Sequence, residues 1–336
     1  MLFKYFINKI IMKLDVQIKK TLEARRSSIY NSKRICLYPG CDYNAIGSHV
    51  LQRAGILSNI VDSSNHFYSI KKLNIFEMND SKHFTVEKVG INDGYKFLGF
   101  CSYHDDNLFR SIETHPIDLD NSIVQALFSY RTLCLELRSK EIELEIFDAV
   151  YKTLKELRPM QFHYVDTKPI KLGIQDLKFF KRELEIEIIK KEPSRFIHRK
   201  VSFNEFKICF SASLTIHDHN NPLTHEEDKY GNVKTTPLAS NILNCFPYQG
   251  KSQIIISMHK DYPCHWATDL TKSIVDTADP SKILSDILTY RLEFWGIQPK
   301  LYESISKEKK STFMKESEDY YDDFSFYIKT NFNLFD

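Results

Sequence analysis

Two pairs of metal-ligating side chains stand out in the first third of the chain. Cys36 and Cys41 flank the segment LYPG, whose Pro-Gly pair favours a tight turn that would aim both thiolates at one point. Further along, Cys101 and His104 are three residues apart, which puts them on one face of a helix that begins there. Three cysteines and one histidine make a closed tetrahedral site, a set typical of structural zinc. The sequence therefore predicts a structural zinc site; the alternative is two unrelated pairs of buried residues.

A histidine between these pairs could act in acid–base chemistry. His49 ends a short apolar run in the segment NAIGSHVLQRAGILSNI, and Arg53 follows it. The order of zinc knuckle, strand ending in histidine, long loop and helix with the second zinc pair resembles the HNH branch of the His-Me finger endonucleases. The resemblance depends on IGSHVLQR and GFCSYHDDNLF. Whole chains of this layout also resemble uncharacterised bacterial HNH-like proteins linked to phage defence or mobile elements.

The resemblance implies an activity and a role for several residues. It implies a metal-dependent endonuclease that hydrolyses phosphodiester bonds in nucleic acid, with DNA favoured over RNA. His49 would be the general base that takes a proton from water, and Asp105 would hold a catalytic Mg²⁺ or Mn²⁺ ion. The chain departs from the family pattern at two positions, since Ser48 stands where Asp is common and Asp105 where His is common. Asn92 is the nearest candidate for the central Asn of the family.

Basic residues near the zinc pairs could contact phosphates. We predict that Arg53, Lys33 and Arg34 bind nucleic acid through its backbone rather than its bases. The whole chain has no such bias, because 46 Lys and Arg residues face 44 Asp and Glu residues, for a net charge of +2. An anionic partner must therefore meet a local patch.

Two other functions stay open on the sequence alone. The first is a non-catalytic zinc-finger adaptor that binds nucleic acid or a protein through the same region, with His49 as a buried hydrogen-bonding residue. A His49→Ala variant that keeps zinc and loses cleavage would exclude it. The second places the activity in the C-terminal half, where a cysteine–histidine nucleophile could come from Cys245, His259, Cys264 and His265.

The remaining cysteines and histidines give weaker signals. Seven cysteines in a chain without a secretion signal argue against disulfides and favour a cytoplasmic location. Cys134 lies on an apolar helical stripe and Cys209 in an apolar strand, so we expect both in the core. A polar loop holds residues that we expect to be solvated: His217, Asp218, His219 and His225.

The elements that position these residues predict an α+β fold. Residues 29–118 read as a ββα-metal or treble-clef zinc domain, rich in loops. Residues 119–192 carry apolar residues at helical spacing and predict long helices, broken near Pro159. Residues 193–336 predict an antiparallel sheet with helices, with KICFSASLTIH and SQIIISMH as strands. The stretch 280–309 returns to helical periodicity.

The ends and partners complete this expectation. Residues 1–28 fit an amphipathic N-terminal helix with a basic face, and their apolar start is shorter than the roughly 20 residues of a membrane span. We therefore expect no membrane partner. The charged helices of 119–192 could support a homodimer or bind a protein partner, although packing within one chain explains them equally well.

Overall fold

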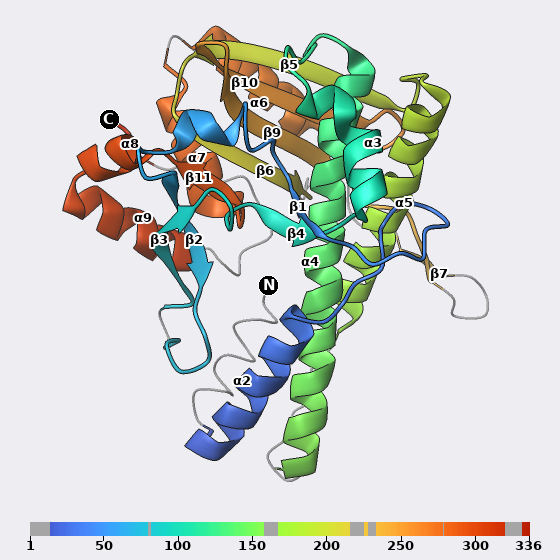
Figure 1. The fold of residues 1–336 in the computed structure, drawn as a ribbon, viewed down its shortest axis with the longest axis vertical. Coiled ribbons are helices and arrows are strands. Elements are labelled where there is room, and N and C mark those ends of the chain that lie inside the picture. The colour runs from blue at the N-terminus through green and yellow to red at the C-terminus, as the bar shows by residue number, and fades with distance from the viewer. Residues whose placement is uncertain are drawn as a thin grey trace.

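The computed structural model describes residues 14–79, 82–157, 167–215, 225–227, 233–277, 279–319 and 331–336. Its largest element is a seven-stranded antiparallel sheet (Figure 1). The strands lie in the order β3 (Phe84–Gly90), β2 (His66–Lys72), β11 (Trp295–Ile297), β6 (Ile208–Leu214), β9 (Asn241–Tyr248), β10 (Lys251–His259) and β5 (Phe196–Asn204). The predicted α+β class and C-terminal antiparallel sheet are confirmed.

The central strands bury side chains on both faces. On β10, Ile254 and Ile256 belong to one hydrophobic cluster, while Ile255 between them belongs to the cluster on the opposite face. Every residue of β9 is buried. Strands covered on both faces appear in sequence as continuous apolar runs, which is why SQIIISMH predicted a strand without polar alternation.

Two long helices cover the face of the sheet that carries Ile255: α4 (Ser122–Leu157) and α5 (Lys168–Lys190). The first half of α4 is buried on nearly all sides, because the sheet, α5 and the metal-ligating region surround it. These helices are those predicted for 119–192, and the expected break near Pro159 lies outside the described residues. Helices on the other face are α6 (His265–Asp276), α7 (Ser281–Arg291) and α9 (Lys307–Asp319).

Helices cover most of the stretch 280–309, as its periodicity predicted, but a strand lies at its centre. The strand β11 follows α7, and the short helix α8 (Pro299–Ser304) follows β11. Trp295 is fully buried and pairs with Phe210 of β6. A Cβ atom on Gly296 would lie 2.8 Å from the side chain of Ile60, so only glycine fits this close approach. Long-range pairing, which helical periodicity cannot report, decides this segment.

The predicted N-terminal helix is described from α2 (Val16–Tyr30) onward, and residues 1–13 lie outside the described part. Asp15 caps it, since its Oδ1 accepts from the backbone N–H of Ile18 at 3.0 Å. The helix packs along the distal half of α4 (Figure 1), where Arg25 donates to Thr153. In the described segments, no helix is both long and apolar enough to cross a membrane.

A second, two-stranded antiparallel sheet lies beside α4 and consists of β1 (Gly47–His49) and β4 (Lys96–Leu98). The helix α3 (Ser102–Glu113) follows β4, so the order is strand, strand, helix. The connection from β1 to β4 contains the 3₁₀ turn Leu57–Ile60 and the β2–β3 hairpin, which joins the seven-stranded sheet. The segment 29–118 thus shares strands with the C-terminal sheet. A third pair consists of β7 (His225–Glu227) and β8 (Val233–Thr235).

Candidate metal centre and the His49 strand

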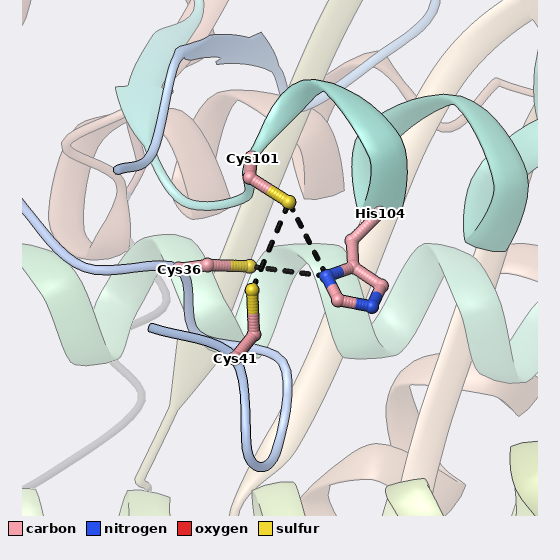
Figure 2. A group of neighbouring side chains, drawn as sticks. All are labelled: Cys36, Cys41, Cys101 and His104. Atoms are coloured by element: carbon pink, nitrogen blue, oxygen red, sulfur yellow. Dashed lines mark hydrogen bonds between the residues drawn. The ribbon is translucent and has the colours of Figure 1, made fainter. Parts of the chain in front are cut away.

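The first ligand pair lies in a tight turn before β1. The N–H of Cys36 donates to the Tyr43 carbonyl (N···O 2.9 Å), and the N–H of Cys41 donates to the Tyr38 carbonyl (3.2 Å). Gly40 has a φ of +70°, a conformation that glycine adopts without steric cost. This is the turn that LYPG predicted, and it directs both thiols toward the start of α3 (Figure 2).

The second ligand pair lies at the start of α3. Cys101 is the N-cap residue, and His104 belongs to the first helical turn. A backbone hydrogen bond from the N–H of Leu37 to the Gly99 carbonyl (2.8 Å) fixes the turn against the segment that leads into α3. Two parts of the chain far apart in sequence therefore present their ligands to each other.

The four side chains converge on one point (Figure 2). All ligand atoms lie within 4.8 Å of one another in the group Cys36, Cys41, Cys101 and His104. The Sγ atoms of Cys41 and Cys101 are 3.8 Å apart, and His104 Nδ1 lies 3.5 Å from the Sγ of Cys36. Zn–S bonds of about 2.3 Å and Zn–N bonds of about 2.0 Å in a tetrahedron require about 3.8 Å between sulfurs and about 3.5 Å from sulfur to nitrogen. The group can therefore bind a metal such as zinc.

The surroundings of this group are closed rather than open. All three thiols are buried, and the Tyr38 ring stacks on the His104 imidazole with ring centroids 3.9 Å apart. In the part of the chain that the structure describes, no other group of three or more His, Cys, Asp or Glu side chains converges in this way.

Burial and hydrogen bonding act on the thiols in opposite directions. Burial raises the pKa of the Cys36 thiol to about 11. Burial also disfavours the Cys101 thiolate, but hydrogen bonds from the His104 N–H and from the other thiols outweigh it, and the pKa of Cys101 is lowered. A thiolate at a helix N-terminus is stabilised by the free N–H groups there. The thiolate form is therefore more favoured at Cys101 than at Cys36.

His49 is half-buried at the end of β1, opposite Lys96 of β4. Its Nε2 atom lies 3.1 Å from the carbonyl oxygen of Ile91. A carbonyl can only accept, so Nε2 carries the proton and Nδ1 keeps a lone pair. Burial lowers the pKa of His49, and the nearby charges of Lys96, Arg53 and Arg131 lower it further. The imidazole is therefore neutral near pH 7, with a fixed tautomer.

Asp105 has a partner that the sequence analysis did not foresee. Its Oδ1 accepts from Nη2 of Arg131 on α4 at 3.2 Å, and Nη1 of the same guanidinium binds Glu113. Arg131 is only 1% exposed. Its one visible signal in the sequence is a single charge inside the apolar run LFSYRTLCL. Its pairing with α3 is a tertiary contact that no local pattern encodes.

The two other positions taken from the HNH pattern, Ser48 and Asn92, differ in exposure. Ser48 is buried, whereas His49 is half-exposed, because neighbouring residues of a strand face opposite sides. Asn92 is exposed, and its Oδ1 accepts from Nη1 of Arg53 at 2.8 Å. Asn92 follows Ile91, so it lies next to the carbonyl that holds His49.

The predicted basic contacts differ in exposure. Arg53 and Lys33 are exposed. Arg34 is 8% exposed, and its guanidinium binds Glu145 and the carbonyl of Ile29. A guanidinium that is buried and engaged in this way is not available to a phosphate. Arg34 instead joins the start of the turn that holds Cys36 and Cys41 to α4.

Of the residues predicted for a C-terminal nucleophile, Cys245 and His259 do not pair as a nucleophile and base. Both ring nitrogens of His259 have other partners, Glu183 at 3.4 Å and the N–H of Asp261 at 3.1 Å. Cys245 is fully buried in the sheet, where burial raises its pKa well above the usual value. Cys134 and Cys209 are core residues as predicted. His217, Asp218, His219 and the side chains of His225 and His265 lie outside the described part of the structure.

A buried polar network between α5 and the sheet also escaped the sequence analysis. Ser257 Oγ lies 2.7 Å from His198 Nδ1, and His198 Nε2 lies 3.2 Å from Glu187 Oε2. The order serine, histidine, carboxylate is that of a hydrolytic triad. All three residues are buried against α4, where Ser129 also donates to Ser257. No substrate can reach this serine, so the network is structural.

Comparison with known proteins adds no family to these observations. No protein-family model, curated protein or solved structure matches this chain. The residues themselves must therefore carry any functional conclusion.

Proposed function

We propose that this protein is an endonuclease that hydrolyses phosphodiester bonds in nucleic acid, with His49 as the general base and a structural zinc ion behind it. The observation that carries the proposal is the hydrogen bond from His49 Nε2 to the Ile91 carbonyl, in a strand–strand–helix unit joined to the Cys3His group. The arrangement agrees with the HNH resemblance in ligand order and in the position of the histidine.

The zinc ion fits the residues that would hold it. Four ligands fill a tetrahedron, which leaves no position for water or substrate, so zinc would hold the turn against α3 rather than enter the reaction. In sequence, Cys36 and Cys41 come before β1, and Cys101 and His104 come after β4. A fixed metal centre would therefore fix the strand that carries His49.

His49 has the properties of a general base. The Ile91 carbonyl keeps the proton on Nε2, so the lone pair of Nδ1 can take a proton from an attacking water molecule. The resulting hydroxide would attack phosphorus, and one P–O ester bond would break. The departing alkoxide would take a proton from solvent water, and the His49 imidazolium would return its proton to solvent. Burial and neighbouring cations keep the imidazole neutral and ready to accept the proton.

The Mg²⁺ or Mn²⁺ ion that the resemblance implies does not fit the described residues. Asp105 Oδ1 is bound to Arg131, and Ser48 offers no carboxylate and is buried on the opposite side of the strand from His49. A hard divalent cation prefers several oxygen ligands, and here the nearest carboxylates, Asp105 and Glu113, both bind the guanidinium of Arg131. In the proposed reaction, His49 therefore activates water without such an ion at Asp105.

The nucleic acid would meet the exposed side of β1. Arg53 lies four residues beyond His49, is exposed, and is held by Asn92. Lys33 is exposed just before the zinc-ligating turn. Both would contact phosphate groups without reading bases, so we expect cleavage with little sequence preference, with DNA favoured over RNA.

The test compares wild type, His49→Ala and His66→Ala after zinc content and circular dichroism have been measured for each. Plasmid DNA and single-stranded RNA are the substrates, with Mg²⁺, with Mn²⁺ and with no added divalent cation. We expect wild type and His66→Ala to cleave and His49→Ala to keep zinc but lose at least 10²-fold in rate, the usual contribution of a general base. Equal rates in wild type and His49→Ala would refute the proposal.

The second candidate is a non-catalytic zinc-finger adaptor, and the ion pair of Asp105 with Arg131 favours it, because it occupies the expected catalytic carboxylate. Tyr43 and Tyr103 beside the metal centre are 77% and 68% exposed, and exposed aromatic side chains of this kind often contact partners. Zinc-loaded wild type that binds nucleic acid but never cleaves it would support the adaptor.

A further inference from the structure

Arg131 joins α4 to the helix that carries His104. Its guanidinium binds Asp105 at 3.2 Å through Nη2 and Glu113 through Nη1, and its Cζ lies 4.0 Å from the centroid of the Phe109 ring. A guanidinium removed from water requires such compensation, because an unpaired buried charge is strongly unfavourable. Two carboxylates and one aromatic face supply it here. Asp105 is thus one of two carboxylates in an ion-pair cluster with Arg131.

We propose that Arg131 is the resident cation of Asp105 and that Mg²⁺ or Mn²⁺ does not bind this carboxylate in the wild-type protein. The proposed function directs attention to Asp105, but the inference itself concerns cation binding and not cleavage. It makes Arg131 a positioning residue, because a side chain with 1% exposure cannot touch a substrate.

Three features of the site carry this inference. Arginine remains protonated in proteins, so the guanidinium cannot yield its place by losing its charge. A divalent cation at Asp105 would face that guanidinium at short range, in a partly buried position where solvent screens like charges poorly. The strand β1 adds no further carboxylate, because the residue before His49 is a serine, and the Ser48 side chain is buried.

A purely structural reading makes Arg131 a link between α3 and α4 without consequence for metal ions. The two readings differ in what happens when the guanidinium is removed. Asp105 and Glu113 would then lose their common cation and present two negative charges near one point. If Arg131 acts as the resident cation, a divalent ion should take its place; if it acts only as a link, cation affinity should not change.

The experiment titrates Mn²⁺ into zinc-loaded protein and measures free Mn²⁺ by electron paramagnetic resonance, with zinc content followed throughout. We expect wild type and Asp105→Asn to bind Mn²⁺ equally weakly. Arg131→Met should bind at least tenfold more tightly, and the double variant Arg131→Met with Asp105→Asn should lose that gain. Arg131→Lys, which keeps a cation, should remain as weak as wild type.

Arg138→Met is the matched control. Arg138 is a buried arginine on the same helix, and its guanidinium donates to the carbonyls of Leu98 (2.9 Å) and Ile35 (2.6 Å). It joins α4 to the same region without touching Asp105, so its loss should not raise Mn²⁺ affinity. A gain there equal to that of Arg131→Met would show that loosening the interface is enough, and would overturn the proposal.

Two other results would also overturn it. One is wild-type Mn²⁺ binding that Asp105→Asn abolishes, and this comparison stands even if Arg131→Met does not fold. The other is a folded Arg131→Met variant with unchanged affinity. Because the readout is Mn²⁺ binding, a wild type that cleaves nothing would refute the nuclease while leaving this inference intact.

Discussion

The metal-ligating region and the core between α4 and the sheet hold their polar groups in different ways. In the metal-ligating region, the thiols and the imidazole face one another. Around the same turn Tyr43 is 77% exposed and Ile35 51% exposed, whereas Leu37 and Tyr38 are only partly buried against the hydrophobic core. In the core, large rings such as Phe128 and Phe246 pack against each other, and the buried Ser257 binds His198. The turn itself adds few fully buried apolar side chains to the interior, whereas the core is built from them.

This difference indicates two separate sources of stability in one chain. A turn that fully buries few apolar side chains gains little from the hydrophobic effect, so we expect its folded form to depend on metal ligation. The core gains its stability from burial of apolar surface on both faces of the sheet. Metal removal should therefore affect the first region and leave the second folded, whereas truncation of a core ring should do the reverse.

Loss of one zinc ligand should have the largest effect. Cys41→Ser should abolish stoichiometric zinc binding and remove most of the roughly 10–16 kcal/mol that structural zinc contributes in small zinc domains. Hydrogen–deuterium exchange should rise sharply over residues 34–46 and at the start of α3, while β9 and β10 stay protected. Cys134→Ala, at a fully buried thiol of α4, is the control and should keep zinc. Loss of protection throughout the sheet would contradict the separation of the two regions.

Truncation of a core ring should have the next largest effect, in the other region. Phe246 of β9 is fully buried and stacks on Phe128 with centroids 5.0 Å apart. Phe246→Ala should lower the free energy of unfolding by about 3–5 kcal/mol, the usual result of deleting a buried ring. Urea denaturation measures this, and bound zinc in the folded variant should stay at the wild-type ratio. Phe76→Ala, at a half-exposed ring, should change stability by less than about 0.5 kcal/mol.

The same contrast explains what the sequence could predict. The ligands Cys36, Cys41, Cys101 and His104 were found because short spacing and a Pro-Gly turn encode the geometry of each pair. The runs KICFSASLTIH and SQIIISMH were found because apolar β-branched residues mark buried strands. Contacts between distant segments were missed: Arg131 with Asp105, and His198 with Glu187. A single polar residue in an apolar run indicates that a partner exists but does not identify it.

The smallest effect concerns a buried carboxylate of the core. Glu187 of α5 binds His198 at 3.2 Å and accepts from the N–H of Phe196 at 2.8 Å. Burial alone would raise the pKa of Glu187, but the hydrogen bonds from His198 and the backbone outweigh it and lower the pKa. Glu187→Gln keeps an acceptor and loses the charge, so we expect a loss of about 1–3 kcal/mol at pH 7.

The sign of the pH dependence follows from the lowered pKa. A carboxyl that is more acidic in the folded state stabilises the fold above its unfolded pKa of about 4.3, and this stabilisation disappears as the pH falls through the folded value. Urea midpoints of wild type and Glu187→Gln should therefore differ at pH 7 and converge in acid. Asp176 of the same helix has the opposite shift, since burial raises its pKa, so Asp176→Asn should be more stable than wild type at pH 7 and converge with it in acid. If the urea midpoints of wild type and Glu187→Gln differed by the same amount at every pH, the charge of the Glu187 carboxylate would contribute nothing to stability. The core would then depend on the geometry of its hydrogen bonds rather than on a buried charge.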